Sequence, residues 1–397
     1  MNNRSLSDLV PYIGDNKRII DSLELKGLEK GRAKFLASLL EEDWKLCDAD
    51  ENTKIWALER GFLPSRVRLY NLDSNNYKDY LSDLDYFLLH PLNNHFAIWI
   101  NDKLTLKYII PKVLHTMEGR LLSVMPEYYL YIENDGRYSY LMDSPSSISR
   151  DEDYLLNLLK EKKILALKPS NGAGGHGFVK LEYESDMVYA NSTLLSKNEY
   201  KDFINTLNGY IVTDFVSQHK QLDLVWNNSA CTLRVIAIKR WNNRYDGGDV
   251  DIIVSYARFG TKKSNGASNL SSGGVAIPYN FNTGEFGSHF YQYLKYAEGG
   301  KIKFEKHPDS NISLAGKILP HWDIVRDVVL SICGYLSSLT YFGFDIIVTD
   351  DGVKMCEINT HPSLDYEQAM CGPVLANPKA REFFDMKMKD KLHCSIL

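Results

Sequence analysis

The chain has 397 residues, of which 44% are hydrophobic, and a formal net charge of -5. This length is enough for two or three domains, and the acidic balance gives no general attraction to nucleic acid or to anionic membranes. The six cysteines show neither paired spacing nor a C-x-x-C motif, which excludes a disulfide framework or a cysteine zinc site and favours reduced thiols.

The first residues, Met1-Asn-Asn-Arg-Ser-Leu-Ser-Asp, lack the apolar core of a signal peptide. The longest apolar region, 328–348, is interrupted by serines, glycines and an aspartate, so we expect no membrane span. The last four residues, Cys394-Ser-Ile-Leu397, match a prenylation box, but so short a pattern often arises by chance. We therefore expect a cytoplasmic protein.

Residues 1–100 are predicted to be mainly helical, with a charged periodic stretch at 26–42 and a stretch rich in aromatics and leucine at 77–90. Asn134-Asp135-Gly136 predicts a hairpin between two tyrosine-rich runs. Two patterns, Ser149-x-x-Glu152 and Ser196-x-x-Glu199, each predict a capping box that opens a helix, the first of which would run to Lys162.

Runs typical of strands follow one another through the middle of the chain. They are Ile164–Lys168, Phe178–Tyr183, Tyr210–Val216, Thr232–Lys239 and Asp251–Phe259. Residues 322–339 carry a helical apolar stripe. The fold class predicted from these elements is α+β, with helices packed on antiparallel sheets.

A glycine-rich loop directly follows the strand that ends in Lys168. Its glycines are Gly172, Gly174, Gly175 and Gly177. A dinucleotide fingerprint would need a helix next, a Walker A motif would need Lys-Ser/Thr where Phe178-Val179 stand, and a protein kinase would need motifs that the chain lacks. A strand follows instead, which favours a flap whose backbone N–H groups approach phosphates above the lysine. The alternative is a purely structural hairpin turn.

Residues 342–359 predict a second hairpin, with Asp350-Asp351-Gly352 as a three-residue loop. If Thr349 pairs with Val353, then Asp345 lies opposite Glu357, and Asn359 shares the face of Glu357. Two facing carboxylates repel each other unless a cation lies between them. Two carboxylates and an amide oxygen form a ligand set that suits Mg²⁺ with substrate phosphates. The alternative is the solvated face of an amphipathic hairpin.

Arg234 lies in the middle of a predicted strand among Leu233, Val235 and Ile236, where an uncompensated charge is costly to bury. This favours an anionic partner, a phosphate or a carboxylate. Arg258 and Asn269 are candidates for further contacts of the same kind. No histidine is assigned a catalytic role, because a lone histidine is more often a structural group.

In their order along the chain, Lys168-Pro169 with its glycine loop, Asp345 and Glu357-x-Asn359 resemble the ATP-grasp superfamily from about residue 101 to 365. More narrowly, the chain resembles the sugar-transfer-associated ATP-grasp proteins of bacterial envelope polysaccharide clusters. The motifs that carry this resemblance are Trp99-Ile-Asn-Asp-Lys103-Leu-Thr, Met125-Pro-Glu-Tyr-Tyr, Thr232-Leu-Arg234-Val and Gly316-Lys-Ile-Leu-Pro320-His-Trp322. Tubulin-tyrosine-ligase-like enzymes are similar over fewer residues, in Leu233-Arg234-Val235 and around Glu357-Ile-Asn-Thr.

The resemblance implies an ATP-grasp fold, with lobes at 101–212 and 213–390 after the helical region 1–100, and ATP and Mg²⁺ as cofactors. Lys103, which alone would be interpreted as a helix-surface lysine, would reach the α-phosphate. Asp214, Phe215 and Val216 would meet adenine, and Asp223 is the nearest candidate for the ribose, although Ser217-Gln-His-Lys-Gln departs from the usual spacing. Lys168, Arg234 and Arg258 would serve the reaction, Asn269 would help to bind the nucleotide, and Asp345, Glu357 and Asn359 would hold the metal.

The resemblance further implies an ATP-dependent carboxylate–amine ligase that works through an acyl-phosphate. Its substrates would be an amino acid or similar acid and an amine or sugar-linked acceptor of the cell envelope, with polysaccharide-synthesis enzymes as possible partners. Two alternatives remain open at this point. One is an ATP-dependent kinase, and the other is a nucleotide-binding accessory protein without turnover.

Overall fold

The structure is a computed structural model that describes residues 4–110, 115–117, 120–133, 136–172, 175–240, 248–264, 266–297 and 300–394. The chain divides into two compact units. The first comprises Met1–Asn94, Ile236–Val254 and His361–Leu397, and the second comprises His95–Val235 and Ser255–Thr360. In the described ranges, no helix combines the length and the apolarity that crossing a membrane requires. The boundaries predicted at residues 100 and 212 remain predictions.

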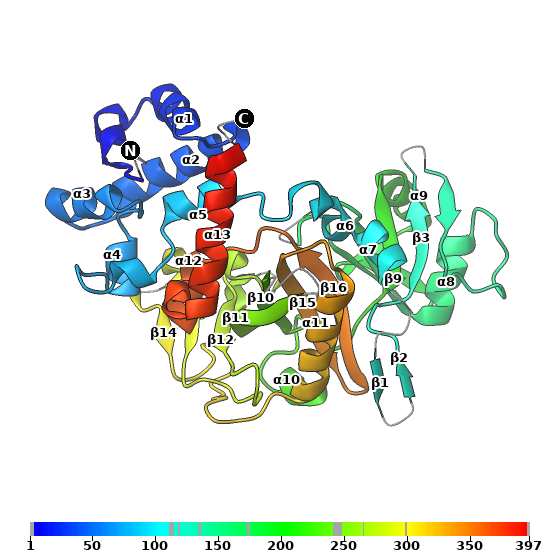
Figure 1. The fold of residues 1–397 in the computed structure, drawn as a ribbon. Helices are drawn as coiled ribbons and strands as arrows, with labels where there is room; N and C mark the ends of the chain where they lie inside the picture. Colours follow the sequence, from blue (N-terminus) through cyan, green and yellow to red (C-terminus); the bar gives the residue numbers. More distant parts are fainter. Residues whose placement is uncertain are drawn as a thin grey trace. The chain divides into compact units, whose positions relative to one another are not determined.

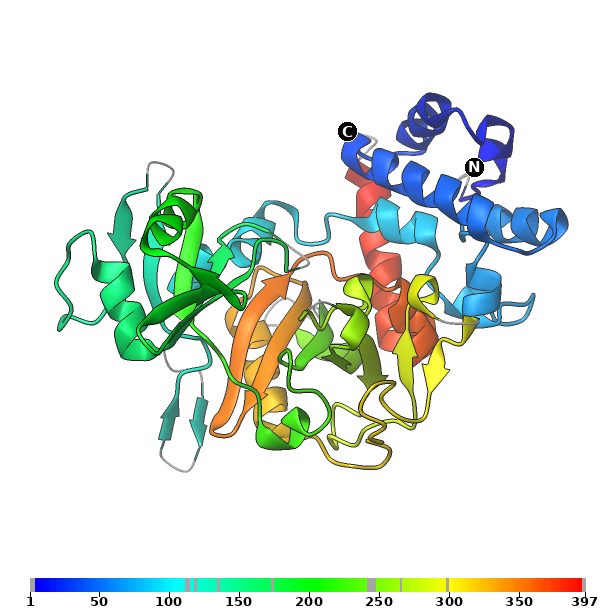
Figure 2. The same cartoon turned by 180° about the vertical axis from the view of Figure 1, so that it is seen from behind.

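The first unit is built largely from helices, as predicted for residues 1–100. They are α1 (Asn16–Leu25), α2 (Lys30–Leu46), α3 (Glu51–Glu59), α4 (Arg66–Tyr70), α5 (Asp83–Leu89), α12 (Asp365–Cys371) and α13 (Pro378–Cys394), with 3₁₀ turns η1 (Ser7–Tyr12), η2 (Tyr77–Asp79) and η8 (Val374–Ala376) (Figure 1). The side chains of Asp15, Asp50 and Ser82 cap α1, α3 and α5 by accepting a backbone N–H three residues later. Figure 2 shows α13 passing beside α5.

A leucine-rich core holds the N-terminal helices of this unit together. Its members include Leu9, Ile19, Leu23, Leu36, Leu40 and Leu84, all fully buried. A buried ion pair adds to this core, because Arg66 on α4 lies 2.9 Å from Asp83 at the start of α5 and 3.6 Å from Asp365 at the start of α12. These contacts connect helices that are far apart in the sequence.

One seven-stranded sheet lies wholly in the second unit. In spatial order its strands are β4 (Tyr138–Tyr140), β3 (Tyr128–Ile132), β9 (Tyr210–Asp214), β5 (Ile164–Pro169), β6 (Val179–Glu184), β7 (Met187–Ala190) and β8 (Thr193–Leu195). Each described pair is antiparallel. The apolar sides of α8 (Tyr154–Lys162) and α9 (Lys197–Asn205) contribute Leu155, Leu158, Leu159 and Ile204 to its core.

The elements before this sheet are short. They are η3 (Asn94–Ala97), α6 (Ile98–Asn101), α7 (Lys103–Ile109) and the hairpin of β1 (His115–Met117) and β2 (Arg120–Leu122). The side chain of Asp102 caps α7 by accepting the N–H of Thr105 at 2.7 Å. This cap fixes where α7 begins, and therefore where Lys103 stands.

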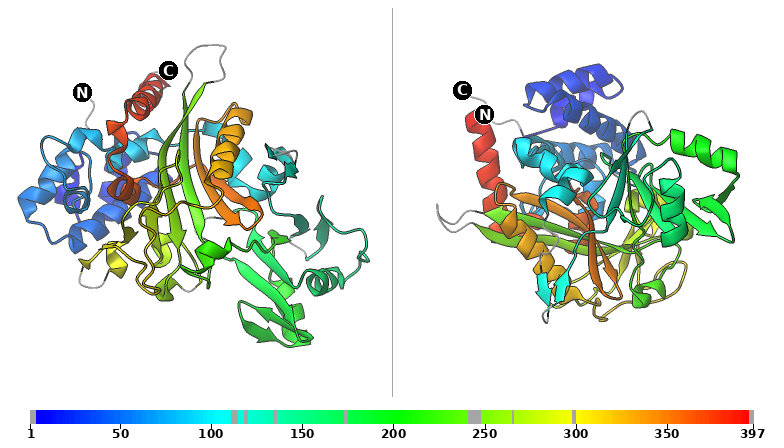
Figure 3. Two further views of the ribbon diagram at one scale, coloured as in Figure 1. Left: turned by 90° about the horizontal axis from the view of Figure 1, so that it is seen from below. Right: turned by 90° about the vertical axis from the view of Figure 1, so that its right-hand side faces the viewer.

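The other seven-stranded sheet has the order β14-β13-β12-β11-β10-β15-β16. Its strands are β10 (Thr232–Arg240), β11 (Asp249–Phe259), β12 (Val275–Pro278), β13 (Phe290–Gln292), β14 (Lys303–Phe304), β15 (Tyr341–Thr349) and β16 (Gly352–Asn359), and between them come η4 (Lys262–Ser264), η5 (Leu270–Ser272) and η6 (Leu294–Tyr296). Helix α11 (Trp322–Tyr335) lies against the β15–β16 hairpin, as Figures 1 and 3 both show. The predicted α+β class with antiparallel sheets is therefore confirmed.

Several element boundaries differ from the predictions. The capping box at Ser149 is wrong, because α8 begins only at Tyr154, and its N-cap Asp153 makes no side-chain cap bond. The box at Ser196 is confirmed, with reciprocal bonds to Glu199 of 3.3 and 2.8 Å. The charged stretch predicted at 26–42 forms α2 a few residues later, and the helix predicted to end at 339 ends at 335.

The predicted hairpin at 134–136 falls partly outside the described residues, since Asn134 and Asp135 are among those left out. Its flanking strands β3 and β4 pair in antiparallel fashion, with Ile132 opposite Tyr138.

Candidate nucleotide and metal site

The β15–β16 hairpin pairs differently from the prediction at its turn. Thr349 lies opposite Gly352 and Val348 opposite Val353. The predicted pairing of Thr349 with Val353 is therefore wrong, and Asp350 and Asp351 alone make the connection. A two-residue turn is the commonest hairpin connection, and Gly352 follows it with a φ of 140° that favours glycine.

A β-bulge restores the predicted pair further along the hairpin. Ile346 lies opposite Met355, whereas Asp345 lies opposite Glu357, so Cys356 is an extra residue without a register partner. The bulge also shifts the alternation of buried residues along β16 by one position. As a result, Glu357 and Asn359 come onto one partly exposed face, and Asp345 stands opposite Glu357 as predicted.

Two arginines from neighbouring strands hold the Asp345 carboxylate. The guanidinium of Arg234 on β10 donates from Nε to Oδ1 at 2.6 Å and from Nη2 to Oδ2 at 3.0 Å. Arg258 on β11 lies 2.9 Å from Oδ2. Burial by itself would raise the pKa of Asp345, but the two guanidinium groups hold that pKa well below its usual range. Asp345 is therefore a buried carboxylate that stays ionised at neutral pH.

Arg258 also connects this carboxylate to the loop before η5. Its Nε donates to Thr232 Oγ1 at 2.9 Å, and its Nη1 donates to Asn269 Oδ1 at 3.0 Å. The structure thus brings Arg234, Arg258 and Asn269 together with Asp345, which is far from the other three in the sequence.

Lys103 connects the hairpin to the glycine loop. Its side chain is only 9% exposed, and Nζ lies 3.2 Å from Glu357 Oε2 and donates to the carbonyl oxygen of Gly172 at 2.8 Å. Its backbone N–H donates to the carbonyl oxygen of Ser170. The lysine is therefore buried between two predicted site segments, and the interpretation as a helix-surface residue is wrong.

The glycine loop connects β5 to β6. Gly175 and Gly177 have φ angles of 75° and 76°, in the left-handed region. At Gly177 a Cβ atom would lie 2.7 Å from the hydroxyl of Tyr210, so a side chain there would force a displacement. At Gly175 a Cβ would lie 3.6 Å from Asn269 Nδ2, which places the loop beside the arginine network. Gly174 lies outside the described residues.

Lys168 stands beneath this loop at the end of β5. Its Nζ lies 5.7 Å from the centre of the Tyr128 ring. Burial lowers the pKa of Lys168, and repulsion from Lys103 acts in the same direction, whereas Cys356 and the carboxylate of Glu357 act in the opposite direction. Because burial raises the pKa of Cys356 to about 11, that cysteine is a neutral thiol near pH 7 and cannot serve as the counter-ion.

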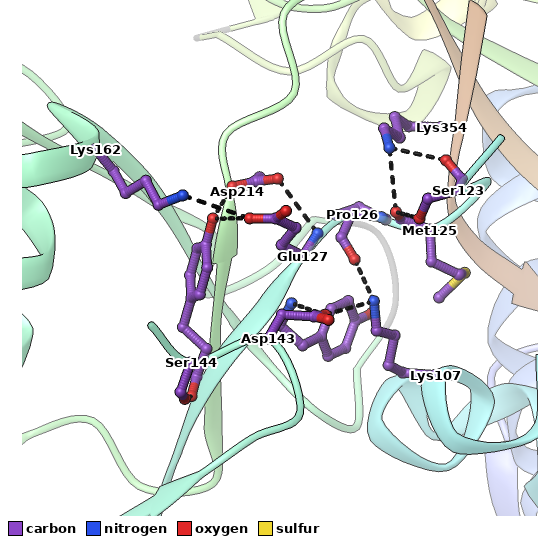
Figure 4. Close-up of polar contacts among 12 residues, drawn as sticks. Lys107, Ser123, Met125, Pro126, Glu127, Asp143, Ser144, Lys162, Asp214 and Lys354 are labelled. Carbon is purple, nitrogen blue, oxygen red and sulfur yellow. Dashed lines mark hydrogen bonds and ion pairs between the residues drawn. The ribbon is translucent and has the colours of Figure 1, made fainter. Parts of the chain in front are cut away.

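Figure 4 shows how lysines hold the segment that begins the Met125-Pro-Glu-Tyr-Tyr motif. Lys354 on β16 donates to the carbonyl oxygens of Ser123 at 2.8 Å and Met125 at 3.3 Å. Lys107 on α7 donates to the carbonyl oxygen of Pro126 at 2.6 Å. The side chains of Lys354 and Lys107 thus hold this segment to β16 and α7 through hydrogen bonds to its backbone oxygens.

Asp214, predicted to meet adenine, has partners from the same motif. Its carboxylate accepts the hydroxyl of Tyr129 and the backbone N–H of Glu127, the latter at 3.3 Å (Figure 4). The Tyr129 oxygen also lies 2.6 Å from Glu127 Oε2, so two carboxylates share its single hydroxyl proton. Burial and these hydrogen bonds raise the pKa of Tyr129, so the phenol stays protonated and keeps donating. The adenine contact itself stays a prediction.

The remaining predicted residues lie after β9, which ends at Asp214 and not at Val216. The ring of Phe215 lies 5.2 Å from Lys180 Nζ. Asp223 ends the short helix α10 (Lys220–Asp223), is exposed, and accepts a hydrogen bond from Gln218 at 2.7 Å. Among the described contacts, none joins Asp223 to the lysines and arginines around Asp345, so its ribose role also stays a prediction.

Sequence reasoning left out four residues of this region. The polar contacts around residues 123–126 are made by Lys107, Asp143, Tyr129 and Lys354. They include a 2.8 Å ion pair between Lys107 and Asp143. The motif Met125-Pro-Glu-Tyr-Tyr was the available signal for them, because it lies at the centre of these contacts.

The oxygen ligands on the hairpin fit a hard divalent cation in part. Within the described ranges, no three or more His, Cys, Asp or Glu side chains gather closely enough to hold a metal by themselves. Asp345 and Glu357 supply two carboxylates. Asn359 uses its amide nitrogen for bonds to Glu357 and Gly343, so its side-chain oxygen takes no part in them. Such a set suits Mg²⁺, which takes its other ligands from phosphates and water.

A comparison with known protein families identifies the family of this chain. The sequence profile of the sugar-transfer associated ATP-grasp family matches residues 91–382. The chain is thus an ATP-grasp protein. The chain belongs to the sugar-transfer associated ATP-grasp family. No curated protein matches it in sequence.

Several solved structures are similar to this chain at low identity. N5-carboxyaminoimidazole ribonucleotide synthetase from Thermotoga maritima is 14% identical with a TM-score of 0.32, and the match covers 70% of this chain and 49% of that one. D-alanyl-alanine synthetase A from Vibrio cholerae is 12% identical with a TM-score of 0.37, covering 74% and 66%. D-alanine–D-alanine ligase from Bacillus anthracis is 14% identical with a TM-score of 0.35, covering 80% and 78%. The chain therefore spans only about half the length of the Thermotoga synthetase.

We call the ion pairs of Asp345 with Arg234 and Arg258 the arginine clamp. Its contribution to stability can be tested. Asp345→Asn leaves two buried arginines without their carboxylate, so we expect the free energy of unfolding to fall by about 3 kcal/mol in urea titrations at pH 7. The matched control is Asp350→Asn in the turn of the same hairpin, where the side chain is 55% exposed and the expected loss is small.

The difference in unfolding free energy between wild type and Asp345→Asn is predicted to depend on pH. Since the folded-state pKa of Asp345 is depressed, its contribution is fully present above the unfolded pKa, about 3.9, and is lost as the pH falls towards the folded value. The difference between wild type and Asp345→Asn should stay constant above about pH 4 and shrink below it. An equal loss in both variants at pH 7 would show that the clamp is not a stabilising contact.

Proposed function

We propose that the chain is an ATP-dependent carboxylate–amine ligase that works through an acyl-phosphate. The observation that carries the proposal is the excess of positive charge around the glycine loop. Four cations, Lys103, Lys168, Arg234 and Arg258, gather with two carboxylates, Asp345 and Glu357. A polyphosphate bound there would balance the buried charge, which offsets the cost of burying Lys168 and Lys103.

The chain's own residues have distinct tasks in binding Mg²⁺ and ATP. Lys168 and Lys103 would hold phosphate oxygens, and the backbone N–H groups around Gly175 and Gly177 would cover them. Asp345, Glu357 and Asn359 would hold Mg²⁺, which when bound neutralises charge on the phosphates. The strand that ends in Asp214, with Phe215 and Val216 after it, would face adenine, and Asp223 would be the candidate for the ribose.

Arg234 and Arg258 are suited to binding the reacting groups, a phosphoryl group and a carboxylate. Each is fixed by the Asp345 carboxylate, so the guanidinium groups are oriented before substrate arrives. Positive charge at this point can hold a phosphoryl group and an attacking carboxylate, two anions that otherwise repel each other. The carboxylate oxygen takes the phosphoryl group and ADP leaves; the amine then forms the amide bond, and phosphate and a proton are released.

The substrates belong to the same proposal. The family's association with sugar transfer supports an acceptor on a cell-envelope or capsular sugar precursor and an amino acid or similar acid as donor. The proposed location is the cytoplasm, where ATP is available. The proposed arrangement is a helical region over residues 1–100 followed by lobes at 101–212 and 213–390.

Nucleotide binding should depend on Lys168. We expect Lys168→Ala to weaken the binding of ATP with Mg²⁺ by about tenfold or more, because a partly buried cation no longer meets the phosphates. Calorimetry measures the affinity, and Lys160→Ala, an exposed lysine of α8, is the matched control with unchanged binding. Equal affinity in the two variants would contradict the phosphate role of Lys168.

Trapping with hydroxylamine tests the reaction type. An acyl-phosphate reacts with hydroxylamine, so a screen of amino acids, uronic acids and short peptides should give a hydroxamate that requires ATP, Mg²⁺ and one class of acid. A kinase acting on a hydroxyl would need a positioned general base, and no such residue has been assigned. ADP release across the screen without any hydroxamate would turn the conclusion towards phosphoryl transfer.

A further inference from the structure

Tyr128 on β3 buries a hydroxyl group that makes no hydrogen bond with any residue the structure describes. The whole side chain is inaccessible to solvent, and its oxygen has no donor or acceptor within reach among those residues. The backbone of Tyr128, in contrast, is well held, because its N–H donates to Asp143 Oδ2 at 2.9 Å. Burying a hydroxyl without a partner is costly, so this group needs an explanation.

The ammonium group of Lys168 lies beside the same ring. Its Nζ is 5.7 Å from the ring centre, and within the described part of the chain it forms neither a hydrogen bond nor an ion pair. Lys107 is also close, at 5.0 Å from the ring centre, but it is bonded to Asp143 and to the carbonyl oxygen of Pro126. Lys168 is partly exposed, so solvent reaches this place. A cation and a hydroxyl that both lack a partner among the described residues are therefore neighbours.

The phenol of Tyr128 is also close to the metal hairpin. Burial is the main cause that raises its pKa, and three neighbours raise it further, namely Cys356, Glu357 and Asp102. The first two of these residues lie on β16, and both also act on the charge of Lys168. The phenol therefore keeps its proton near pH 7 and can donate it, and it shares its surroundings with Lys168.

We propose that the Tyr128 hydroxyl is a further nucleotide-binding group, which donates to a phosphate oxygen that Lys168 also holds. The inference rests on the proposed function, in which Lys168 meets the phosphates of ATP. A phosphate oxygen is charged and accepts several hydrogen bonds, so it can take an ammonium N–H and a phenol O–H together. One phosphate group would thus satisfy both partnerless groups, whereas a cation would satisfy the hydroxyl alone.

Tyr154 on α8 provides the matched comparison. It is fully buried as well, and its hydroxyl oxygen also has no hydrogen-bond partner among the described residues. Its neighbours are apolar or aromatic, since it belongs to the core with Leu155 and Leu158 and its ring packs edge-on against Tyr140 at 4.9 Å. Tyr154 therefore has the burial of Tyr128 without its place beside Lys168 and the hairpin.

The experiment measures ADP binding by calorimetry, with and without Mg²⁺, in the full-length wild type, Tyr128→Phe and Tyr154→Phe. We expect Tyr128→Phe to weaken ADP binding by about tenfold in both conditions, because a hydrogen bond to a charged oxygen is lost. Its urea midpoint should stay equal or rise, since phenylalanine fills the same space and removes a partnerless hydroxyl. Tyr154→Phe should have the same effect on the midpoint and leave ADP affinity unchanged.

The other outcomes separate this inference from the proposed function. Equal ADP affinity in wild type and Tyr128→Phe would overturn the inference, and weaker binding in Lys168→Ala would still support the proposed function. A loss confined to the Mg²⁺ condition would assign the hydroxyl to water on the metal and contradict the phosphate contact. A clear drop in the urea midpoint of Tyr128→Phe alone would show that the hydroxyl has a structural partner, which also contradicts it. If the wild type bound neither ADP nor ATP, the proposed function would fail and the inference with it.

Discussion

The ionised carboxylate of Asp345 is the constraint on which the candidate site depends. Buried between Arg234 and Arg258, it fixes both guanidinium groups and keeps a charge that burial alone would remove. Through Arg258 it also positions Asn269, which lies beside the glycine loop. Strands β10 and β11 and the distant strand β15 therefore share one electrostatic centre.

The facing carboxylates of the hairpin are stabilised by protein cations. From the sequence, the repulsion between the facing carboxylates of Asp345 and Glu357 was an argument for a bound metal. In the structure each carboxylate already has a cationic partner, the two arginines for Asp345 and Lys103 for Glu357. In the proposed function, binding of Mg²⁺ with a nucleotide would exchange one pair of partners: Glu357 would turn from Lys103 to the metal, and Lys103 would become available to phosphate oxygens.

Much of the fold was predictable, because strand alternation and helix caps are local signals. The site was only partly predictable. The register of Asp345 with Glu357 was right although the turn was misjudged: the turn has one residue fewer than expected, and the bulge at Cys356 inserts one residue. A bulge depends on the partner strand, so periodicity does not reveal it. The burial of Lys103 was likewise missed, since it results from contacts with Gly172 and Glu357, which are remote in sequence.

The most direct test of this account is the effect of Mg²⁺ on ADP affinity in wild type and in Glu357→Gln, measured by calorimetry. The account predicts that Mg²⁺ strengthens ADP binding to the wild type by about tenfold, because Glu357 turns from Lys103 to the metal. In the variant, metal-free ADP should bind at least as well as in the wild type, since Lys103 no longer has a carboxylate partner, and Mg²⁺ should add little. The same strengthening by Mg²⁺ in both proteins would show that the β15–β16 hairpin does not hold the metal.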